Sequence, residues 1–253
     1  MIANYHTHTW RCKHCVGDDR QFVEEAIKGG LKILGFADHV PYVYENGFVS
    51  SVRMKPSEAD EYFHTLSSLR EEYKKDIKIY IGFEAEYIPV LMQTQDDFLK
   101  DYPLDYMIMG QHYSEPEYEA RHYMNGTESS RLVEYVDMVI EGLSSGRYRY
   151  LAHPDMPKVA EKDECFTREF TRLCKFLKEN DIPFETNMLG FVTKRNYPSD
   201  EFMRIAASVG VKTIVGCDAH NPVFLSDAEN QNATRRYAES FGLEVIDVLP
   251  GLT

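Results

Sequence analysis

Seven of the nine histidines in this chain, together with two carboxylates, form a pattern that could bind metal ions. His6 and His8 are separated by one residue, and Asp218 and His220 repeat that spacing. Residues two apart in an extended strand project from the same face, so each pair is placed to chelate one ion. An acid–base pair or a Ser-His-Asp triad needs only one or two histidines. The set therefore predicts a site for several metal ions, and imidazole with carboxylate suits zinc, iron(II) or manganese.

The elements that would position these groups are predicted strands alternating with helices. Apolar runs predict strands at 2–6, 31–39, 77–87, 105–113, 148–155, 182–188 and 211–220, and a last apolar segment at 243–249. Helices are predicted near 18–30, 57–75, 95–100, 129–143, 165–180, 199–210 and 231–241. Asp18 or Asp19 is the predicted N-cap of the first helix, and Ser57 that of the second. This alternation indicates parallel pairing, closed as a barrel or open as a doubly wound sheet.

The candidate ligands fall at the ends of these predicted strands. They are His6, His8, His39, Glu84, His112, His153, Asp218 and His220. In a parallel barrel all strand carboxyl ends open on one face, so these groups are expected to meet in space. Glu86, close to Glu84, shows that carboxylates are common in this stretch. His64, in a predicted helix, and His122, in a predicted loop, lie outside the pattern and are predicted to be surface residues.

Composition limits the class of protein. The chain has 253 residues, a formal net charge of −13 and 43% hydrophobic residues, which predicts one globular domain over 1–253 and excludes a disordered chain. An acidic surface repels phosphate backbones, so nucleic acid is not an expected partner. Apolar runs fall far short of the roughly 18 residues that a membrane-spanning helix needs. The first ten residues do not resemble a signal peptide, so we expect a cytoplasmic protein without membrane contact.

Five cysteines, without a secretion signal, are expected to be reduced thiols. Cys12 and Cys15 form a CxxC motif around His14. A structural zinc site needs four ligands, usually from two such pairs, and the other cysteines are scattered along the chain. A zinc knuckle and a redox CxxC are therefore alternatives that the sequence does not favour.

The ordered set HTHxxxxxH, ADH, a glutamate after GF, GQH, AHPD and CDAH resembles the polymerase and histidinol phosphatase (PHP) family of metal-dependent phosphoesterases. The resemblance covers essentially the whole chain. It implies an α/β fold, a distorted seven-stranded β/α (TIM-like) barrel with three divalent metal ions at the strand carboxyl ends. It further implies one metal held by His6, His8, Glu84 and Asp218, a second by Glu84, His112 and His153, and a third by His14, His39 and His220.

Within the family, the chain looks most similar to the histidinol-phosphatase branch. The similarity lies in its length and in the stretches 38–62, 185–191 and 194–198. In that branch an arginine ahead of a Tyr-Pro pair contacts the substrate phosphate, which points to Arg195, with Arg53 as a second candidate. The implied reaction is hydrolysis of L-histidinol phosphate to L-histidinol and phosphate, a step of histidine biosynthesis.

The expected mechanism uses a metal-bridging hydroxide as nucleophile, without a phosphoenzyme. Glu84, Asp218 and His220 would contribute as ligands of the hydroxide-activating metals, while Asp18 is one candidate for protonating the leaving oxygen. One alternative is a phosphoesterase of the same fold acting on a nucleotide, a sugar phosphate or phosphotyrosine. Others are a non-catalytic metal-binding module and an amidohydrolase-like barrel, although the latter needs a carboxylated lysine or a glutamate where this chain has Gln111 and His112.

Overall fold

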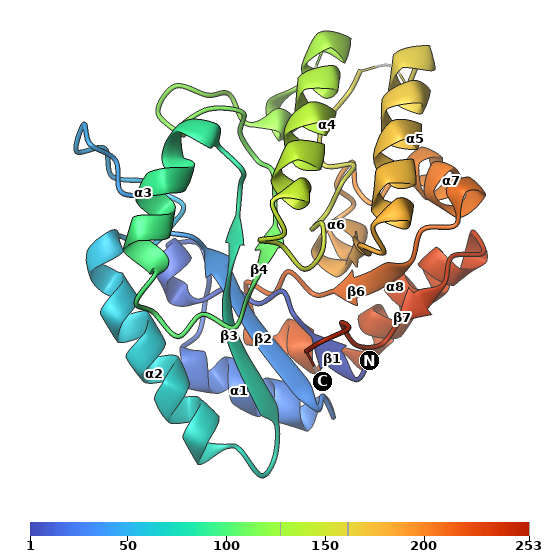
Figure 1. Cartoon of the computed structure of the whole chain (residues 1–253). Helices are drawn as coiled ribbons and strands as arrows, with labels where there is room; N and C mark the ends of the chain where they lie inside the picture. The colour runs from blue at the N-terminus through green and yellow to red at the C-terminus, as the bar shows by residue number, and fades with distance from the viewer. Residues whose placement is uncertain (127, 161, 253) are drawn as a thin grey trace. The chain divides into compact units, whose positions relative to one another are not determined.

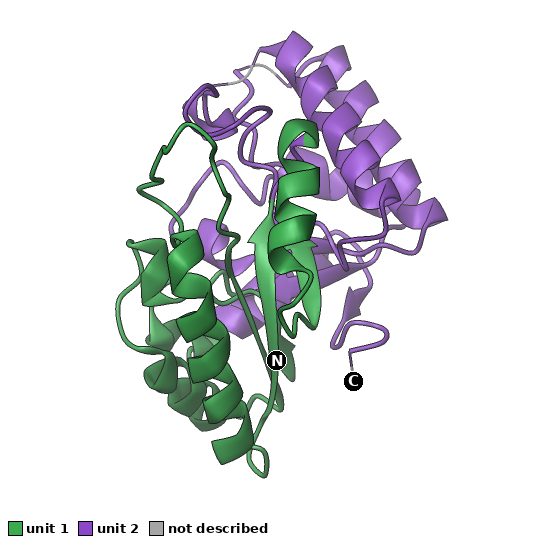
Figure 2. Cartoon of the chain, turned by 60° about the vertical axis from the view of Figure 1, so that its left-hand side comes forward, with its two compact units in different colours: residues 1–85, 89–108, 217–229 green, residues 86–88, 109–216, 230–253 purple. Residues whose placement is uncertain are grey.

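The strands of this protein run parallel and are interleaved with helices, as a computed structural model of residues 1–126, 128–160 and 162–252 shows (Figure 1). The chain divides into two compact units (Figure 2). Unit 1 comprises residues 1–85, 89–108 and 217–229, and unit 2 comprises residues 86–88, 109–216 and 230–253. Among the residues described, no helix combines the length and the apolar character needed to cross a membrane.

Unit 1 is built on a four-stranded sheet with the strand order β1-β2-β3-β4. Its strands are β1 (Ala3–Asn4), β2 (Ile33–His39), β3 (Lys78–Ala85) and β4 (Tyr106–Met109), the last reaching one residue beyond the unit. Its α-helices are α1 (Asp19–Lys28), α2 (Ala59–Glu72) and α3 (Pro89–Leu99), with short 3-10 helices η1 (Trp10–Cys12), η2 (Pro56–Glu58) and η4 (Pro222–Leu225). The register pairs His39 of β2 directly with Glu84 of β3, so the fold itself brings two candidate ligands together.

Unit 2 contains a three-stranded parallel sheet with the order β5-β6-β7. These strands are β5 (Phe184–Asn187), β6 (Thr213–Gly216) and β7 (Val245–Ile246). The helices are η3 (Tyr123–Asn125), α4 (Ser129–Ser144), α5 (Glu164–Glu179), α6 (Met188–Val192), α7 (Asp200–Val209) and α8 (Ala228–Ser240), whose first two residues belong to unit 1. α4 and α5 pack against each other, as do α5 and α7, through buried aromatic and leucine side chains.

The predicted strand at 148–155 is wrong. Leu151 alone forms parallel bridges, to Met109 on one side and to Phe184 on the other. Two residues later, His153 adopts a positive φ of 62°, which ends the extended backbone. The described residues thus form sheets of four and three strands. Leu151 alone bridges β4 and β5, and the seventh strand is β7, which pairs with β6.

Two of the predicted helices begin at a side-chain cap. Asp18 accepts a hydrogen bond from the Gln21 backbone and begins α1 through a capping box, and Ser199 accepts one from the Phe202 backbone at α7. Ser57 does not cap the second helix; it lies inside η2, and the chain continues into α2 without a side-chain cap. α3 begins at Pro89 rather than near residue 95, because proline fits the first turn of a helix.

The core of unit 1 is organised around Tyr106. Its hydroxyl donates to the Tyr5 carbonyl at 2.7 Å, and the Phe36 carbonyl lies 3.1 Å away. The ring reaches this position because Gly35 has no side chain: a Cβ there would lie 2.2 Å from the Tyr106 hydroxyl. This hydrogen bond fixes the backbone of Tyr5, the residue before His6, against β4.

Candidate metal centre

Four candidate ligands from distant parts of unit 1 converge in a buried position. His6 and His8 follow β1, Glu84 lies on β3 and Asp218 follows β6, and all four are at most 4% exposed. The two Nε2 atoms of His6 and His8 are 3.1 Å apart. The distances from His6 Nε2 to Glu84 Oε2 and Asp218 Oδ1 are 3.6 and 3.5 Å, and those from His8 Nε2 are 3.6 and 3.2 Å.

These distances match what one tetrahedral ion requires. Zinc bonds of about 2.0–2.1 Å place neighbouring ligand atoms about 3.3–3.4 Å apart. Five of the six ligand-to-ligand distances among the four groups fall between 3.1 and 3.6 Å. Two imidazoles and two carboxylates are also a donor set that zinc, iron(II) and manganese accept. The residues present therefore fit a divalent metal ion.

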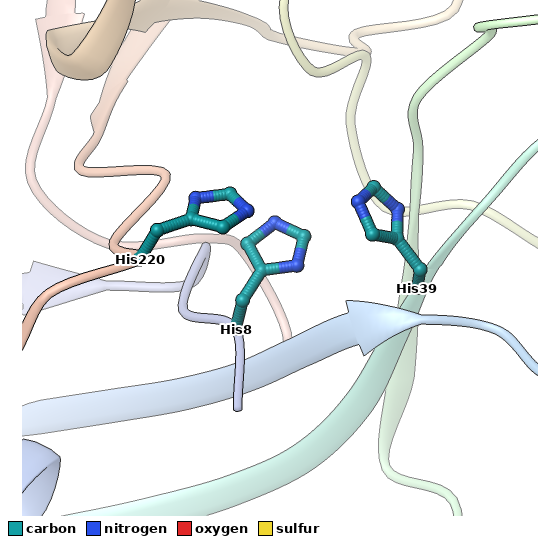
Figure 3. A group of neighbouring side chains, drawn as sticks. All are labelled: His8, His39 and His220. Atoms are coloured by element: carbon teal, nitrogen blue, oxygen red, sulfur yellow. The ribbon is translucent and has the colours of Figure 1, made fainter. Parts of the chain in front are cut away.

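Three further histidines surround this group in unit 1. His39 Nδ1 lies 3.0 Å from Glu84 Oε2, and His14 Nε2 lies 3.0 Å from His220 Nε2. The rings of His8 and His220 stack with their centroids 4.0 Å apart. Figure 3 shows His8, His39 and His220 turned toward one another from three separate segments, and one ligand atom of each lies within 4.8 Å of the others.

The strand-like pairing that delivers these side chains forms between the two ends of unit 1. Thr7 and Ala219 make an isolated parallel bridge, in which the His8 backbone donates to Ala219 and the Ala219 backbone donates to His6. The bridge sets His6 and His8 beside Asp218 and His220. Asp218 adopts a positive φ of 48°, a conformation that aspartate tolerates better than most residues.

Contacts to the Nδ1 atoms of His8, His14 and His220 fix the orientation of these imidazoles. Asp38, fully buried, lies 3.4 Å from His8 Nδ1 and accepts hydrogen bonds from the Thr9 side chain and backbone. His14 Nδ1 is 2.7 Å from the Cys12 carbonyl, and His220 Nδ1 is 3.0 Å from the Asp218 carbonyl. Each contact occupies one ring nitrogen and leaves Nε2 directed at the centre, as metal-binding histidines require.

Neighbouring charges shift the pKa values of Asp218 and His220 in this cluster. Burial alone would raise the pKa of Asp218, but His6, His220 and His8 hold the pKa of this carboxyl well below its usual range. Burial acts to lower the pKa of His220, yet hydrogen bonds with Asp218 and Cys12 raise it to about 10. In the absence of metal His220 therefore retains its proton, and an incoming ion must displace it.

In unit 2, the side chains of His112 and His153 lie next to each other. Their ring centroids are 5.2 Å apart, and both side chains are largely buried. His112 Nδ1 lies 2.9 Å from Glu86 Oε1, and Glu86 is itself only 1% exposed. Sequence reasoning assigned no role to Glu86 or to Asp38. A carboxylate within a buried strand was the available signal, because burial of a charge requires a specific partner.

The two candidate arginines differ in their surroundings. Arg53 is 2% exposed, donates to the Val40 carbonyl at 3.1 Å and packs over the Tyr42 ring at 4.8 Å. It borders a cavity of about 150 Å³ in unit 1. Arg195, in unit 2, is exposed and donates to the Tyr197 hydroxyl at 2.6 Å. Arg195 is thus placed next to the Tyr-Pro pair that drew attention to it.

The remaining polar candidates have structural roles or lie at the surface. His64 is exposed on α2, as predicted. His122 is half-buried: it begins η3 by accepting a hydrogen bond from Met124, and its ring lies 5.5 Å from that of His112. Its prediction as a plain surface residue is therefore wrong. Asp18 is occupied as the N-cap of α1.

Known proteins resemble this chain in sequence and in fold. The PHP domain family matches it over residues 4–189. A Deinococcus radiodurans protein named "Probable histidinol-phosphatase" is 25% identical to it, covering 87% of each chain. The histidinol-phosphatase of Bacillus subtilis is 32% identical over 43% of this chain and 42% of its own.

Among solved structures, the histidinol phosphate phosphatase of Lactococcus lactis, complexed with zinc, L-histidinol and phosphate, has a TM-score of 0.74. The two are 20% identical, and the match covers 98% of this chain and 96% of the other. At this level of identity the similarity shows a shared fold.

Proposed function

The chain belongs to the PHP domain family, and from this we propose that it is a metal-dependent phosphatase that hydrolyses L-histidinol phosphate to L-histidinol and phosphate. The observation that carries the proposal is the buried set of His6, His8, Glu84 and Asp218, whose ligand atoms have the spacing of one metal ion. The curated relatives named histidinol-phosphatase support the choice of substrate.

We propose three divalent ions in the site, with zinc, iron or manganese as the metals. The proposed ligands are those that the family resemblance implies: His6, His8, His14, His39, Glu84, His112, His153, Asp218 and His220. Bound divalent ions would supply charge neutralisation for phosphoryl oxygens and acidity for coordinated water. Both are needed because a phosphate monoester dianion repels nucleophiles and has a poor leaving group.

The chain's own residues would prepare the site for this chemistry. Asp38 and Glu86 hold the rings of His8 and His112 in one orientation, so that no reorganisation is needed when substrate binds. Arg195 and Arg53 are proposed to bind the substrate phosphate, since a planar guanidinium can donate two parallel hydrogen bonds to it. The release of its contact with the Tyr197 hydroxyl would free Arg195 Nη1 for that role.

We further propose that residues 1–253 form a single PHP domain whose two sheets belong to a distorted seven-stranded barrel. The family match extends through parts of both units, which supports one domain. The parallel pairing in each sheet and the isolated parallel bridges at Thr7 and Leu151 support the barrel.

The proposal is tested by phosphate release from L-histidinol phosphate, compared with nucleotides, sugar phosphates and phosphotyrosine. Chelator-treated protein is assayed after addition of zinc, iron(II) or manganese. We expect L-histidinol phosphate to exceed the other esters in kcat/KM by orders of magnitude. Preference for another ester would overturn the assignment of L-histidinol phosphate as substrate. No turnover with any metal would overturn the proposed phosphatase activity.

A variant of Arg195 tests substrate binding. Arg195→Ala is expected to lower kcat/KM about 10- to 100-fold, because a charged hydrogen bond contributes about 1.5–3 kcal/mol. Arg204→Ala, on the exposed surface of α7, is the matched control and should retain wild-type kcat/KM. Equal kcat/KM for both variants would remove Arg195 from the site.

A further inference from the structure

A small cavity with aromatic walls lies in the segment of unit 1 that follows β2. Its volume is about 150 Å³, and Tyr42, Tyr44 and Phe48 each contribute a ring to its lining. An apolar cavity of about this volume is large enough to hold one benzene molecule. The cavity therefore has room for a single small ring.

A tight turn holds two of the lining rings in a corner. The Gly47 backbone donates to the Tyr44 carbonyl at 3.1 Å, and Gly47 has the positive φ of 74° that glycine adopts without strain. The ring centroids of Tyr44 and Phe48 are 5.3 Å apart, and their planes are inclined at 81°. A third ring can place its face against one of them and its edge against the other, which are both favoured aromatic arrangements.

The charged groups that line the cavity are cations. The Arg53 guanidinium lies over the Tyr42 ring at 4.8 Å, and Lys55 is the second cation. None of the described residues that line the cavity is acidic. A flat uncharged ring can stack among aromatic rings and a planar guanidinium, whereas an ammonium group would be repelled.

On one side the cavity is attached to two candidate metal ligands. Arg53 donates to the Val40 carbonyl at 3.1 Å, and Val40 directly follows His39. The Val40 backbone in turn donates to the Glu84 carbonyl at 2.9 Å. A residue of the cavity lining thus contacts the residue that lies between the cavity and both ligands.

On another side a lysine connects the cavity to a third candidate ligand. Lys13 directly precedes His14, and its ammonium group donates to the carbonyl of Ser50, which lines the cavity. As many bonds separate Cα from Nζ in lysine as separate phosphorus from the imidazole ring in L-histidinol phosphate. A substrate whose phosphate lies at the candidate ligands can therefore reach the cavity with its ring.

We propose that this cavity binds the imidazole ring of the substrate, and that Tyr44 and Phe48 determine the preference for phosphate esters that carry a ring. The inference rests on the proposed phosphatase function and adds the part of the site that recognises the leaving group. Because the rings touch only the leaving group, their loss should lower kcat/KM for ring-bearing esters and leave ringless esters unaffected.

The unmodified protein tests the cavity with three esters that differ only in the group beyond the amino alcohol. L-Histidinol phosphate is compared with L-phenylalaninol phosphate, whose phenyl ring cannot bind a metal ion, and with L-alaninol phosphate, which lacks a ring. Both ring-bearing esters should exceed L-alaninol phosphate in kcat/KM by at least about tenfold. A phenyl ring that gives no advantage over the ringless ester would overturn the proposal.

Variants assign the preference to the two rings. Tyr44→Leu and Phe48→Leu should each lower kcat/KM for L-histidinol phosphate about 3- to 10-fold and leave that for L-alaninol phosphate unchanged. Tyr118→Leu is the matched control, because Tyr118 is 40% exposed in unit 2 and does not line the cavity; it should change neither value. Equal losses for both esters would show that the rings only support the fold, and would overturn the proposal.

Saturation-transfer NMR with L-histidinol measures ring contact without turnover. The imidazole protons should receive more saturation than the CH2OH protons, and Tyr44→Leu should reduce this difference. If this contact is found but no phosphate ester is hydrolysed, the ring site stands and the proposed phosphatase fails. If L-histidinol phosphate is hydrolysed but neither ring variant discriminates between the esters, the phosphatase stands and the ring site fails.

Discussion

The contact between the Glu86 carboxylate and the His112 ring should affect metal affinity measurably. The Glu86 carboxylate is buried and lies 2.9 Å from Nδ1 of His112. Loss of such a partner typically weakens metal binding 10- to 100-fold. Glu86→Gln is therefore expected to lower zinc affinity by that factor at one ion, as measured by competition with a chromophoric chelator.

The control for this change is Glu141→Gln. Glu141 is exposed on α4, accepts a hydrogen bond from the Tyr87 hydroxyl and touches no candidate ligand. It should leave every zinc affinity unchanged. If Glu86→Gln behaves like Glu141→Gln, Glu86 has no part in orienting a metal ligand.

Asp155 provides a pH-dependent term in the stability of unit 2. Burial raises its pKa to about 6, although the Ser199 backbone and side chain donate hydrogen bonds to it. The unfolded residue titrates near about 3.9. The folded state therefore holds a proton that the unfolded state releases between these values, so stability is gained as pH falls through this window and lost as pH rises through about 6.

The size of this pH-dependent change in stability follows from the pKa shift of Asp155. Two pKa units correspond to about 3 kcal/mol, an upper bound for the change between about pH 4 and about pH 7. The free energy of unfolding of the wild type, minus that of Asp155→Asn, should be about 2–3 kcal/mol larger at about pH 4 than at about pH 7. Urea unfolding of metal-free protein at both pH values measures it. A difference that does not vary with pH would contradict the buried carboxyl.

At the scale of elements, the packing of β2 against β4 depends on one missing side chain. A methyl group on Gly35 would collide with the Tyr106 hydroxyl at 2.2 Å. Gly35→Ala should therefore cost about 1–3 kcal/mol, since overpacking forces neighbouring atoms to move. The drop in Tm and in urea midpoint measures this cost.

A double-mutant cycle with Tyr106→Phe separates the collision from other effects. Phenylalanine removes the hydroxyl that donates to Tyr5, and it also gives space to the new methyl group. Gly35→Ala should thus be less destabilising in the Tyr106→Phe background than in the wild type. Strictly additive costs would show that the two residues do not interact.

Local sequence signals account for the helices better than for the strands. Asp18 caps α1, one of the two residues predicted to do so, and the helix predicted at 199–210 begins after its cap, Ser199, because capping is decided by a few neighbouring residues. The segment 148–155 has the composition of a strand, but only Leu151 finds partners on both sides before His153 turns the chain. The length of a strand depends on its neighbours, and these are distant in sequence.

At the scale of the whole molecule, metal should contribute to stability as well as to chemistry. An ion that binds only the folded chain adds about 2.7 kcal/mol at about 100 times its Kd. For a chain of this length, that corresponds to a rise in Tm of about 5–10 °C. Thermal unfolding with zinc, compared with chelator, should show this increase.

Calcium is the matched control for charge, because it carries the same charge as zinc but prefers oxygen ligands in larger numbers. It should raise Tm much less than zinc does, and the zinc effect should shrink in a His6→Ala, His8→Ala double variant. Equal effects of both ions would indicate general screening of the acidic surface.

The candidate site could be predicted from sequence to the extent that its ligands follow strands. The structure brings seven of the nine candidate ligands together in unit 1 and pairs the other two, His112 and His153, in unit 2. Their role as ligands stays a prediction. Asp38 and Glu86 could not be ranked from spacing alone, because their significance lies in contacts made through folding.

The bridge between Thr7 and Ala219 also determines when, during synthesis of the protein, the metal centre can form. Its partners lie more than two hundred residues apart, so the two halves of the buried centre cannot meet until the ribosome has synthesised the chain as far as Ala219. Closing so long a loop carries an entropic cost before any contact rewards it. Until then the amino-terminal histidines would lack Asp218 and His220 beside them, so the complete centre would form only at a late stage of maturation.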